Sequence, residues 1–259
     1  MAENLIKIMT FNVRRDTRGD SYLWRDRRQM VADIIRRYSP EIIGFQETQP
    51  HMLDYLRESL PDYDTYAVSR APKSSRGEST PVFVSNAMFA ITQRQSFMLS
   101  KTPEAPASKS WHTMCARICS MVCISKKGSD TPFLIVANTH LDHFSKLARR
   151  EGLKLILNRI QMENGQTPFI ITGDFNDIPE SSVFRCLSQT ATSCYDIIPP
   201  SERGQLLTYN RFTDAVKGRP IDYLFAGKGI EIVETTIIRD RRPGVMPSDH
   251  YPVLVTVKI

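Results

Sequence analysis

Potential metal ligands and proton carriers stand at the ends of apolar runs in this sequence. Asn12 follows the first such run, Glu47 follows the second, and His140 follows a third. A fourth run ends in Gly-Asp-Phe-Asn, which contains Asp174 and Asn176. Each run therefore ends in a residue able to hold a cation or to move a proton.

Three more polar residues lie near the end of the chain. Asp222 interrupts the apolar run Ile-Asp-Tyr-Leu-Phe, where a buried carboxylate is costly unless another group pairs with it. Asp249 and His250 stand side by side before the last apolar run. A carboxylate that accepts a hydrogen bond from an imidazole orients the ring and favours its protonated form. Such a ring suits phosphate binding or proton donation.

Taken one at a time, these fragments also have structural interpretations. An Asp-His pair is common by chance. The Gly-Asp-Phe-Asn segment is equally typical of a turn whose side chains bond to the backbone, and Asn12 is equally typical of a loop cap. The functional interpretation depends on the whole set.

That set runs in the order Asn, Glu, His, Asp-x-Asn, Asp and Asp-His, from Asn12 to His250. It resembles the motif order of the endonuclease/exonuclease/phosphatase superfamily, which includes abasic-site endonucleases, deoxyribonuclease-I-like enzymes, neutral sphingomyelinases, inositol polyphosphate phosphatases and deadenylases. The resemblance implies an α/β (α+β) fold, a four-layer αββα sandwich of two mixed β-sheets flanked by helices. It places the site at one end of the sheets.

The resemblance also implies which residues hold a metal ion. Glu47 would be the main ligand, and Asn12 and Asp249 would complete the shell directly or through water. Hard oxygen ligands of this kind suit Mg²⁺ or Mn²⁺, and the absence of cysteine ligands disfavours zinc.

The remaining motif residues would carry out the chemistry. Asp174 would accept the proton of the attacking water, while Asn176 positions the water or the phosphate. His140 and His250 would donate hydrogen bonds to the non-bridging oxygens as negative charge builds up on them. Asp222 would pair with His250 and hold its ring.

The motif wording is most similar to deadenylase-like members and their uncharacterised bacterial relatives. The sequence therefore predicts a metal-dependent phosphoester hydrolase, first a phosphodiesterase or nuclease acting on RNA or DNA. The alternatives are a phosphomonoesterase or small-molecule phosphodiesterase with the same site, and a binding module that has lost catalysis. Specificity depends on variable loops, of which 69–80 and 100–112 are long and polar. Arg76 and Trp111, in these loops, are the substrate-binding candidates.

The composition is that of an ordinary folded protein, with 41% hydrophobic and 24% charged residues in 259. The formal net charge of +6 suits a phosphate-bearing substrate without requiring one. Five cysteines without a C-x-x-C pair argue against a disulfide framework or a zinc site. Neither a signal peptide nor a span of membrane length is evident, so a cytoplasmic location is the default expectation.

Strand-like and helix-like patterns alternate along the chain without a repeat or linker, so one domain over residues 1–259 is the simplest organisation. The patterns predict a helix that Trp24 opens and Pro40 ends, and further helices at 52–60, 143–162 and 181–187. They predict strands at 5–11, 41–45, 63–68, 81–86, 89–99, 114–125, 133–139, 169–172, 221–225, 230–238 and 253–259.

Overall fold

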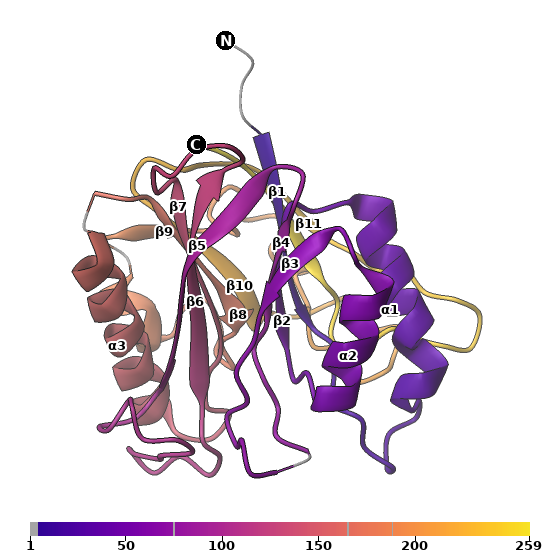
Figure 1. Cartoon of the computed structure of the whole chain (residues 1–259). Helices are drawn as coiled ribbons and strands as arrows, with labels where there is room; N and C mark the ends of the chain where they lie inside the picture. Colours follow the sequence, from indigo (N-terminus) through magenta and orange to yellow (C-terminus); the bar gives the residue numbers. More distant parts are fainter. Residues whose placement is uncertain (1–4, 75, 165, 188) are drawn as a thin grey trace.

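Two six-stranded β-sheets pack face to face in the computed structural model, which describes residues 5–74, 76–164, 166–187 and 189–259. Helices α1 (Trp24–Tyr38) and α2 (Pro50–Ser59) cover the outer face of the first sheet. Helix α3 (Lys146–Asn164) covers the second sheet (Figure 1). The layers are helix, sheet, sheet and helix, so the predicted αββα sandwich is confirmed.

The first sheet has the strand order β11-β12-β1-β2-β4-β3. Its strands are β1 (Leu5–Asn12), β2 (Ile42–Gln46), β3 (Tyr63–Tyr66), β4 (Val82–Ser85), β11 (Glu231–Ile237) and β12 (Val253–Lys258). The second sheet has the order β5-β6-β7-β8-β10-β9. Its strands are β5 (Phe89–Met98), β6 (Ile118–Lys126), β7 (Leu134–His140), β8 (Phe169–Asp174), β9 (Ala191–Ser193) and β10 (Asp222–Gly227).

Both sheets are mixed, since each contains one parallel pair of neighbouring strands. These pairs are β1 with β2 and β7 with β8, and the other neighbours run antiparallel. Parallel neighbours point the same way, so their carboxyl ends meet at one edge of the sheet. In Figure 1 strand β1 descends from the top, and this edge lies toward the bottom of the view.

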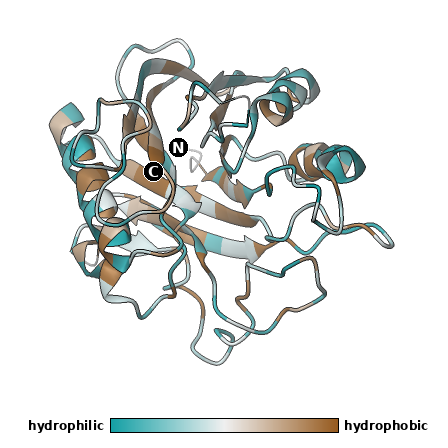
Figure 2. Ribbon diagram, turned by 90° about the horizontal axis from the view of Figure 1, so that it is seen from below, coloured by the Kyte–Doolittle hydropathy of each residue, from teal (hydrophilic) through white to brown (hydrophobic). Residues whose placement is uncertain are grey.

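Alternation along β1 supplies both faces of the first sheet with apolar side chains. Ile6 and Ile8 belong to the core between the sheets, whereas Met9 and Phe11 pack in a second core beneath α1 and α2. Successive strand residues point to opposite faces, so a strand buried on both sides needs such a continuous apolar run. Figure 2 shows the resulting hydrophobic strands in the interior and hydrophilic residues on the outer faces of the helices.

A polar layer interrupts the core between the sheets, directly behind the strand ends. The Asn138 amide donates hydrogen bonds to the carbonyl oxygens of Phe45 (2.7 Å) and Pro81 (2.8 Å). Its oxygen accepts from Gln46 Nε2 (2.8 Å) and Thr172 Oγ1 (3.2 Å). Buried polar groups of this kind are stable only when paired. The layer therefore fixes how the two sheets sit against each other at the functional edge.

Most predicted elements are confirmed, with differences at four places. Residues 114–117 lie outside β6. Residues 143–145 form a turn before α3, because Asp142 Oδ1 accepts from the backbone N–H groups of Phe144 (3.0 Å) and Ser145 (2.6 Å). The helix predicted at 181–187 is a 3₁₀ helix, η1 (Ser182–Cys186). Strand β9 was not predicted, since its three residues carry too little pattern.

Among the described residues, every helix is too short or too polar to cross a membrane.

Candidate active site

Strand register brings the predicted catalytic residues to one edge of the sandwich. Asn12 is paired with Gln46, the residue before Glu47, at the ends of β1 and β2. On the second sheet His140 is paired with Asp174 at the ends of β7 and β8. Asp222 begins the antiparallel neighbour β10 and is also paired with Asp174. Residues far apart in sequence therefore meet where the sheets end.

Asn12 joins the two halves of this cluster. Its Nδ2 donates hydrogen bonds to Glu47 Oε1 (3.1 Å) and to Asp174 Oδ2 (3.0 Å), which belong to different sheets. Its Oδ1 accepts from the backbone N–H of Arg14 (2.9 Å). Because both ends of the amide are engaged with protein groups, Asn12 orients the two carboxylates in this arrangement.

Glu47 is ionised and its backbone is constrained. Its φ of 60° lies in the left-handed region, which costs free energy in a residue other than glycine and often marks a functional position. Burial works against its charge, but the backbone N–H of Arg15 (3.0 Å from Oε2) and the charges of His250 and Arg14 hold the pKa of Glu47 below its usual value.

Asp174 lies at the centre of the second half. Its Oδ2 is 3.5 Å from His140 Nε2 and 3.8 Å from His250 Nε2. Its Oδ1 accepts from the backbone N–H of Asn176 (2.9 Å). Burial and the charge of Asp222 raise the pKa of Asp174 to about 7. Such a carboxylate is suited to take up a proton near neutral pH.

The two histidines are in opposite charge states. His250 Nδ1 lies 2.8 Å from Asp222 Oδ2. Burial opposes the charge of His250, yet the charge and hydrogen bond of Asp222 raise its pKa well above the usual value, so the ring is an imidazolium. Burial, with the charges of Arg117 and Arg70, lowers the pKa of His140 well below the usual value. His140 is therefore neutral at physiological pH.

The donor set fits a hard divalent cation. Ligand atoms of Glu47, His140 and Asp174 lie within 4.8 Å of one another. Those of Asp174, Asp222 and His250 are equally close, but the protonated His250 ring has no lone pair free for a cation. Asp222 Oδ1 is buried and has no hydrogen-bond partner among the residues that the structure describes. Buried carboxylates that face each other need a compensating positive charge. Carboxylate oxygens are the ligands that Mg²⁺ and Mn²⁺ prefer.

Asp249 lies on the Glu47 side of the cluster, and an arginine stands between the two acids. Arg14 Nη1 is 3.7 Å from Asp249 Oδ2 and 4.0 Å from Glu47 Oε2, while Arg14 Nε donates to Asp20 (2.7 Å). The sequence showed Arg14 only as a member of a basic cluster. Nothing in its spacing indicated that it reaches both predicted metal ligands.

A second set of charged residues that the sequence did not reveal lies beside His140. Glu78 Oε1 pairs with Arg70 (2.7 Å). Arg117 Nη2 lies 2.9 Å from His143 Nδ1, and Arg117 Nε lies 3.7 Å from Asp142 Oδ2. These contacts join separate loops, so no local sequence motif predicts them. As a result, His143 lies next to Arg117.

Neither predicted substrate-binding residue lines the small pocket formed beside Glu47 and His140. Arg76 is exposed on its loop and lines a shallow pocket with Arg15 and His51. Trp111 is half-buried, and its carbonyl oxygen accepts from Ser145 Oγ (2.6 Å). Whether they touch a substrate stays a prediction.

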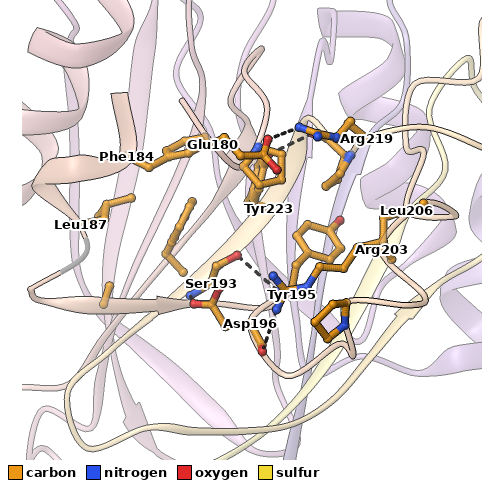
Figure 3. A pocket seen from close by; sticks show the side chains of 16 residues that line it. Glu180, Phe184, Leu187, Ser193, Tyr195, Asp196, Arg203, Leu206, Arg219 and Tyr223 are labelled. Carbon is orange, nitrogen blue, oxygen red and sulfur yellow. Dashed lines mark hydrogen bonds and ion pairs between the residues drawn. The ribbon is translucent and has the colours of Figure 1, made fainter. Parts of the chain in front are cut away.

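A cavity of about 450 Å³ lies along β10, beside η1 and β9 (Figure 3). Its aromatic lining includes Tyr195 and Tyr223, and the Arg219–Glu180 ion pair lies at its margin. The Tyr195 hydroxyl donates to the backbone oxygen of Asp222 (2.8 Å). This hydrogen bond helps to hold the strand that carries Asp222. None of the predicted catalytic side chains lines the cavity.

Comparison with known proteins gives consistent matches. The model of the Endonuclease/Exonuclease/phosphatase family matches residues 9–250. A solved protein of that family from Bacteroides thetaiotaomicron is 27% identical with a TM-score of 0.88, covering 100% of this chain and 99% of that one. A mannosyl-6-phosphatase from Bacteroides thetaiotaomicron is also 27% identical, with a TM-score of 0.86 and coverage of 97% and 99%.

Curated relatives match less of their own length. A probable RNA exonuclease of Schizosaccharomyces pombe is 23% identical over 199 residues, which cover 71% of this chain and 38% of the relative. The chain spans less than half the length of the curated relatives it matches, with coverage of 45% and 38%.

Proposed function

The chain belongs to the endonuclease/exonuclease/phosphatase family of phosphoester hydrolases, and we propose that it cleaves its ester by direct attack of water with bound Mg²⁺ or Mn²⁺. The observation that carries the proposal is the position of Asp174. Its carboxylate lies between Asn12, His140 and His250, and its pKa is about 7. One buried group is thus placed to accept a proton beside the groups that stabilise negative charge.

Each residue then has one task. Glu47, with Asp249 and Asn12 beside it, would hold the cation, which would supply positive charge for the phosphoryl oxygens and the leaving alkoxide. Asp174 takes the proton of the attacking water, whose oxygen bonds to phosphorus as the ester bond breaks. Asn176 orients the water or the phosphate through its Oδ1, since its Nδ2 donates to the Leu141 carbonyl (3.1 Å).

The histidines stabilise the transition state as negative charge grows on the phosphoryl oxygens. The His250 imidazolium supplies a full charge, held in place by Asp222. The neutral His140 supplies an N–H donor without adding a second positive charge beside Arg117. Prealigned donors of this kind commonly contribute the largest share of catalysis.

Two substrate classes are compatible with this site. The probable RNA exonuclease relative supports a nucleic acid, and the mannosyl-6-phosphatase neighbour supports a small phosphate ester. Several arginines that lie close together in the sequence are already paired with carboxylates, among them Arg149 with Asp177 and Arg242 with Asp33. This internal pairing leaves less charge for a long polyanion and supports the small ester.

A substrate panel tests the proposal. Purified protein with Mg²⁺ or Mn²⁺ is assayed on single-stranded RNA, single- and double-stranded DNA, abasic duplex, sugar phosphates and inositol phosphates. Asp174→Asn, which removes the proton acceptor without changing the shape, is expected to lower turnover by at least about a hundredfold on the active class. Equal rates for the variant and the wild type would overturn the role of Asp174, and hydrolysis of no ester would overturn the proposal.

Salt dependence then separates the two classes. Binding of a nucleic acid releases counterions, so its affinity falls steeply as salt is added, whereas a small ester shows a shallow dependence.

A further inference from the structure

A small pocket opens beside Glu47 and His140. Arg70, Arg117 and Glu78 line it. Arg70 comes from the loop after β3, and Arg117 immediately precedes β6. The pocket thus adjoins the catalytic cluster and brings two guanidinium groups to it.

Both guanidinium groups are withdrawn from solvent. The side chain of Arg117 is 5% exposed and that of Arg70 is 15% exposed. Glu78 pairs closely with Arg70, but Arg117 Nε is 3.7 Å from Asp142 and has no hydrogen-bond partner among the described residues. Burial and the nearby charge of Arg70 lower the pKa of Arg117, while the charges of Asp142, Asp174 and Glu78 act in the opposite direction. An anionic oxygen that accepts from Arg117 Nε would give this buried donor a partner.

The size of the pocket limits what can enter. Its free space of about 10 Å³ is close to the minimum that holds one water molecule. A second phosphate group or a sugar is far larger. The pocket fits a single oxygen atom that belongs to a phosphate already placed at the cluster.

We propose that Arg70 and Arg117 receive the third terminal oxygen of a phosphomonoester, so that the enzyme selects phosphomonoesters over phosphodiesters. This inference rests on the proposed hydrolytic function. During attack of water, three phosphoryl substituents spread around phosphorus. In the proposed arrangement one would lie toward Glu47, one toward His250, and the third toward His140 and the two arginines.

A phosphodiester meets two obstacles at this position. Its third substituent carries a carbon group that a pocket for one atom does not admit. It also carries one negative charge fewer than a phosphomonoester dianion, so it gains less from the buried guanidinium groups. Shape and charge therefore select the same class of substrate.

Two esters with the same leaving group test this selection: 4-nitrophenyl phosphate and methyl 4-nitrophenyl phosphate. The measured quantity is the ratio of their kcat/KM values, monoester over diester. We expect wild type to favour the monoester at least about tenfold, and Arg117→Gln to lower the ratio by about tenfold or more, as for a lost charge-assisted hydrogen bond. Arg117→Lys, which keeps the charge, should retain part of the preference for the monoester.

Arg149→Gln is the matched control. Arg149 is also buried and ion-paired, with Asp177 (2.9 Å), and it donates to the Asp142 carbonyl (2.9 Å), but it does not line the pocket. The ratio of kcat/KM values, monoester over diester, should be the same for Arg149→Gln as for the wild type. Because Arg117→Gln removes a buried partner, Arg70→Gln on the other loop gives a second measurement if the first variant does not fold.

The outcomes distinguish a failure of the proposed subsite from a failure of the proposed hydrolytic function. A wild type that hydrolyses both esters without preference, or Arg117 and Arg70 variants that keep the wild-type ratio, would overturn the subsite alone. A wild type that hydrolyses neither ester nor any member of the larger panel would overturn the hydrolytic function and the subsite together. A lowered ratio in both arginine variants with an unchanged Arg149 control supports the subsite.

Discussion

Arg27 donates a hydrogen bond of 3.1 Å to the carbonyl oxygen of Pro247, which lies 220 residues further along the chain. The Arg27 side chain is fully buried and also donates to the carbonyl oxygens of Val13 and Arg14. Val13 follows Asn12, and Pro247 lies two residues before Asp249. One guanidinium therefore ties the loop after β1 to the loop before β12, and both loops carry residues of the proposed metal site.

Replacement of Arg27 by lysine is expected to loosen this connection. A lysine ammonium is a point charge and does not span the fork of carbonyl oxygens that the planar guanidinium reaches. Each carbonyl left buried without a partner costs about 1–3 kcal/mol. We expect Arg27→Lys to lower the free energy of unfolding by about 2 kcal/mol or more and to weaken Mn²⁺ binding. Denaturant unfolding and calorimetry measure the two effects.

Arg28→Lys is the control for this change. Arg28 lies on the same helix, exposed, above the Tyr55 ring at 4.7 Å from its centroid. Its replacement should change stability by less than about 0.5 kcal/mol, as for most surface positions. An Arg27→Lys protein as stable as this control would show that the two loops do not depend on Arg27.

Glu47→Gln is expected to remove most of the metal affinity while the fold persists. The amide has the same shape as the carboxylate, but a neutral oxygen binds a hard dication far more weakly. Calorimetric titration with Mg²⁺ and Mn²⁺ measures the loss, and thermal unfolding without metal checks the fold. Unchanged affinity would mean that the cation is held elsewhere in the cluster.

Gly44→Ala is expected to disturb the contact between the sheets. A Cβ at this position would lie 2.4 Å from Thr172 Oγ1 and 2.7 Å from Asn138 Cγ. Asn138 has little freedom to move, because it is hydrogen-bonded on both ends of its amide. Overpacking of this kind typically costs about 1–3 kcal/mol, and denaturant unfolding measures it.

Gly19→Ala provides the comparison, since no atom lies within 4 Å of a Cβ built there. Its free energy of unfolding should stay within about 0.5 kcal/mol of the wild type. If both alanine variants were equally stable, the sheets would be able to separate slightly at Gly44 without cost.

The strands and helices were predictable where their pattern is long and regular. The alternation in β1 and the apolar spacing of α1 both follow from the burial of one or two faces. By contrast, β9 has three residues, and its position depends on pairing with β10. The turn before α3 depends on the Asp142 side chain, whose acceptor role is decided by local hydrogen bonds.

For the site, the sequence indicated the residues that follow strands but not those that reach in from loops. Asn12 and Asp174 are brought together by strand register, which the motif order implies. Arg70 and Arg117 depend on the path of two loops, which no periodicity encodes. The residues proposed to carry the chemistry could therefore be selected from the sequence, while those proposed to set specificity could not.

The pairing of Asp222 with His250 predicts a shift in the pH dependence of catalysis. Burial alone would lower the pKa of His250, but Asp222, with Asp249 and Asp174 nearby, raises it well above its usual value. The imidazolium therefore persists through neutral pH, and the rate that depends on it falls only when alkaline pH removes its proton. Asp222→Asn deletes the largest stabilising charge, so the pKa of His250 drops and the fall in rate moves to lower pH. Ionisation of the attacking water raises the rate with pH in both proteins, so the comparison of kcat/KM profiles at fixed Mn²⁺ isolates the histidine. An NMR titration of the His250 ring in each protein gives the same shift directly. If the alkaline limbs of the two profiles coincide, Asp222 does not tune His250, and its contribution is to the structure of β10.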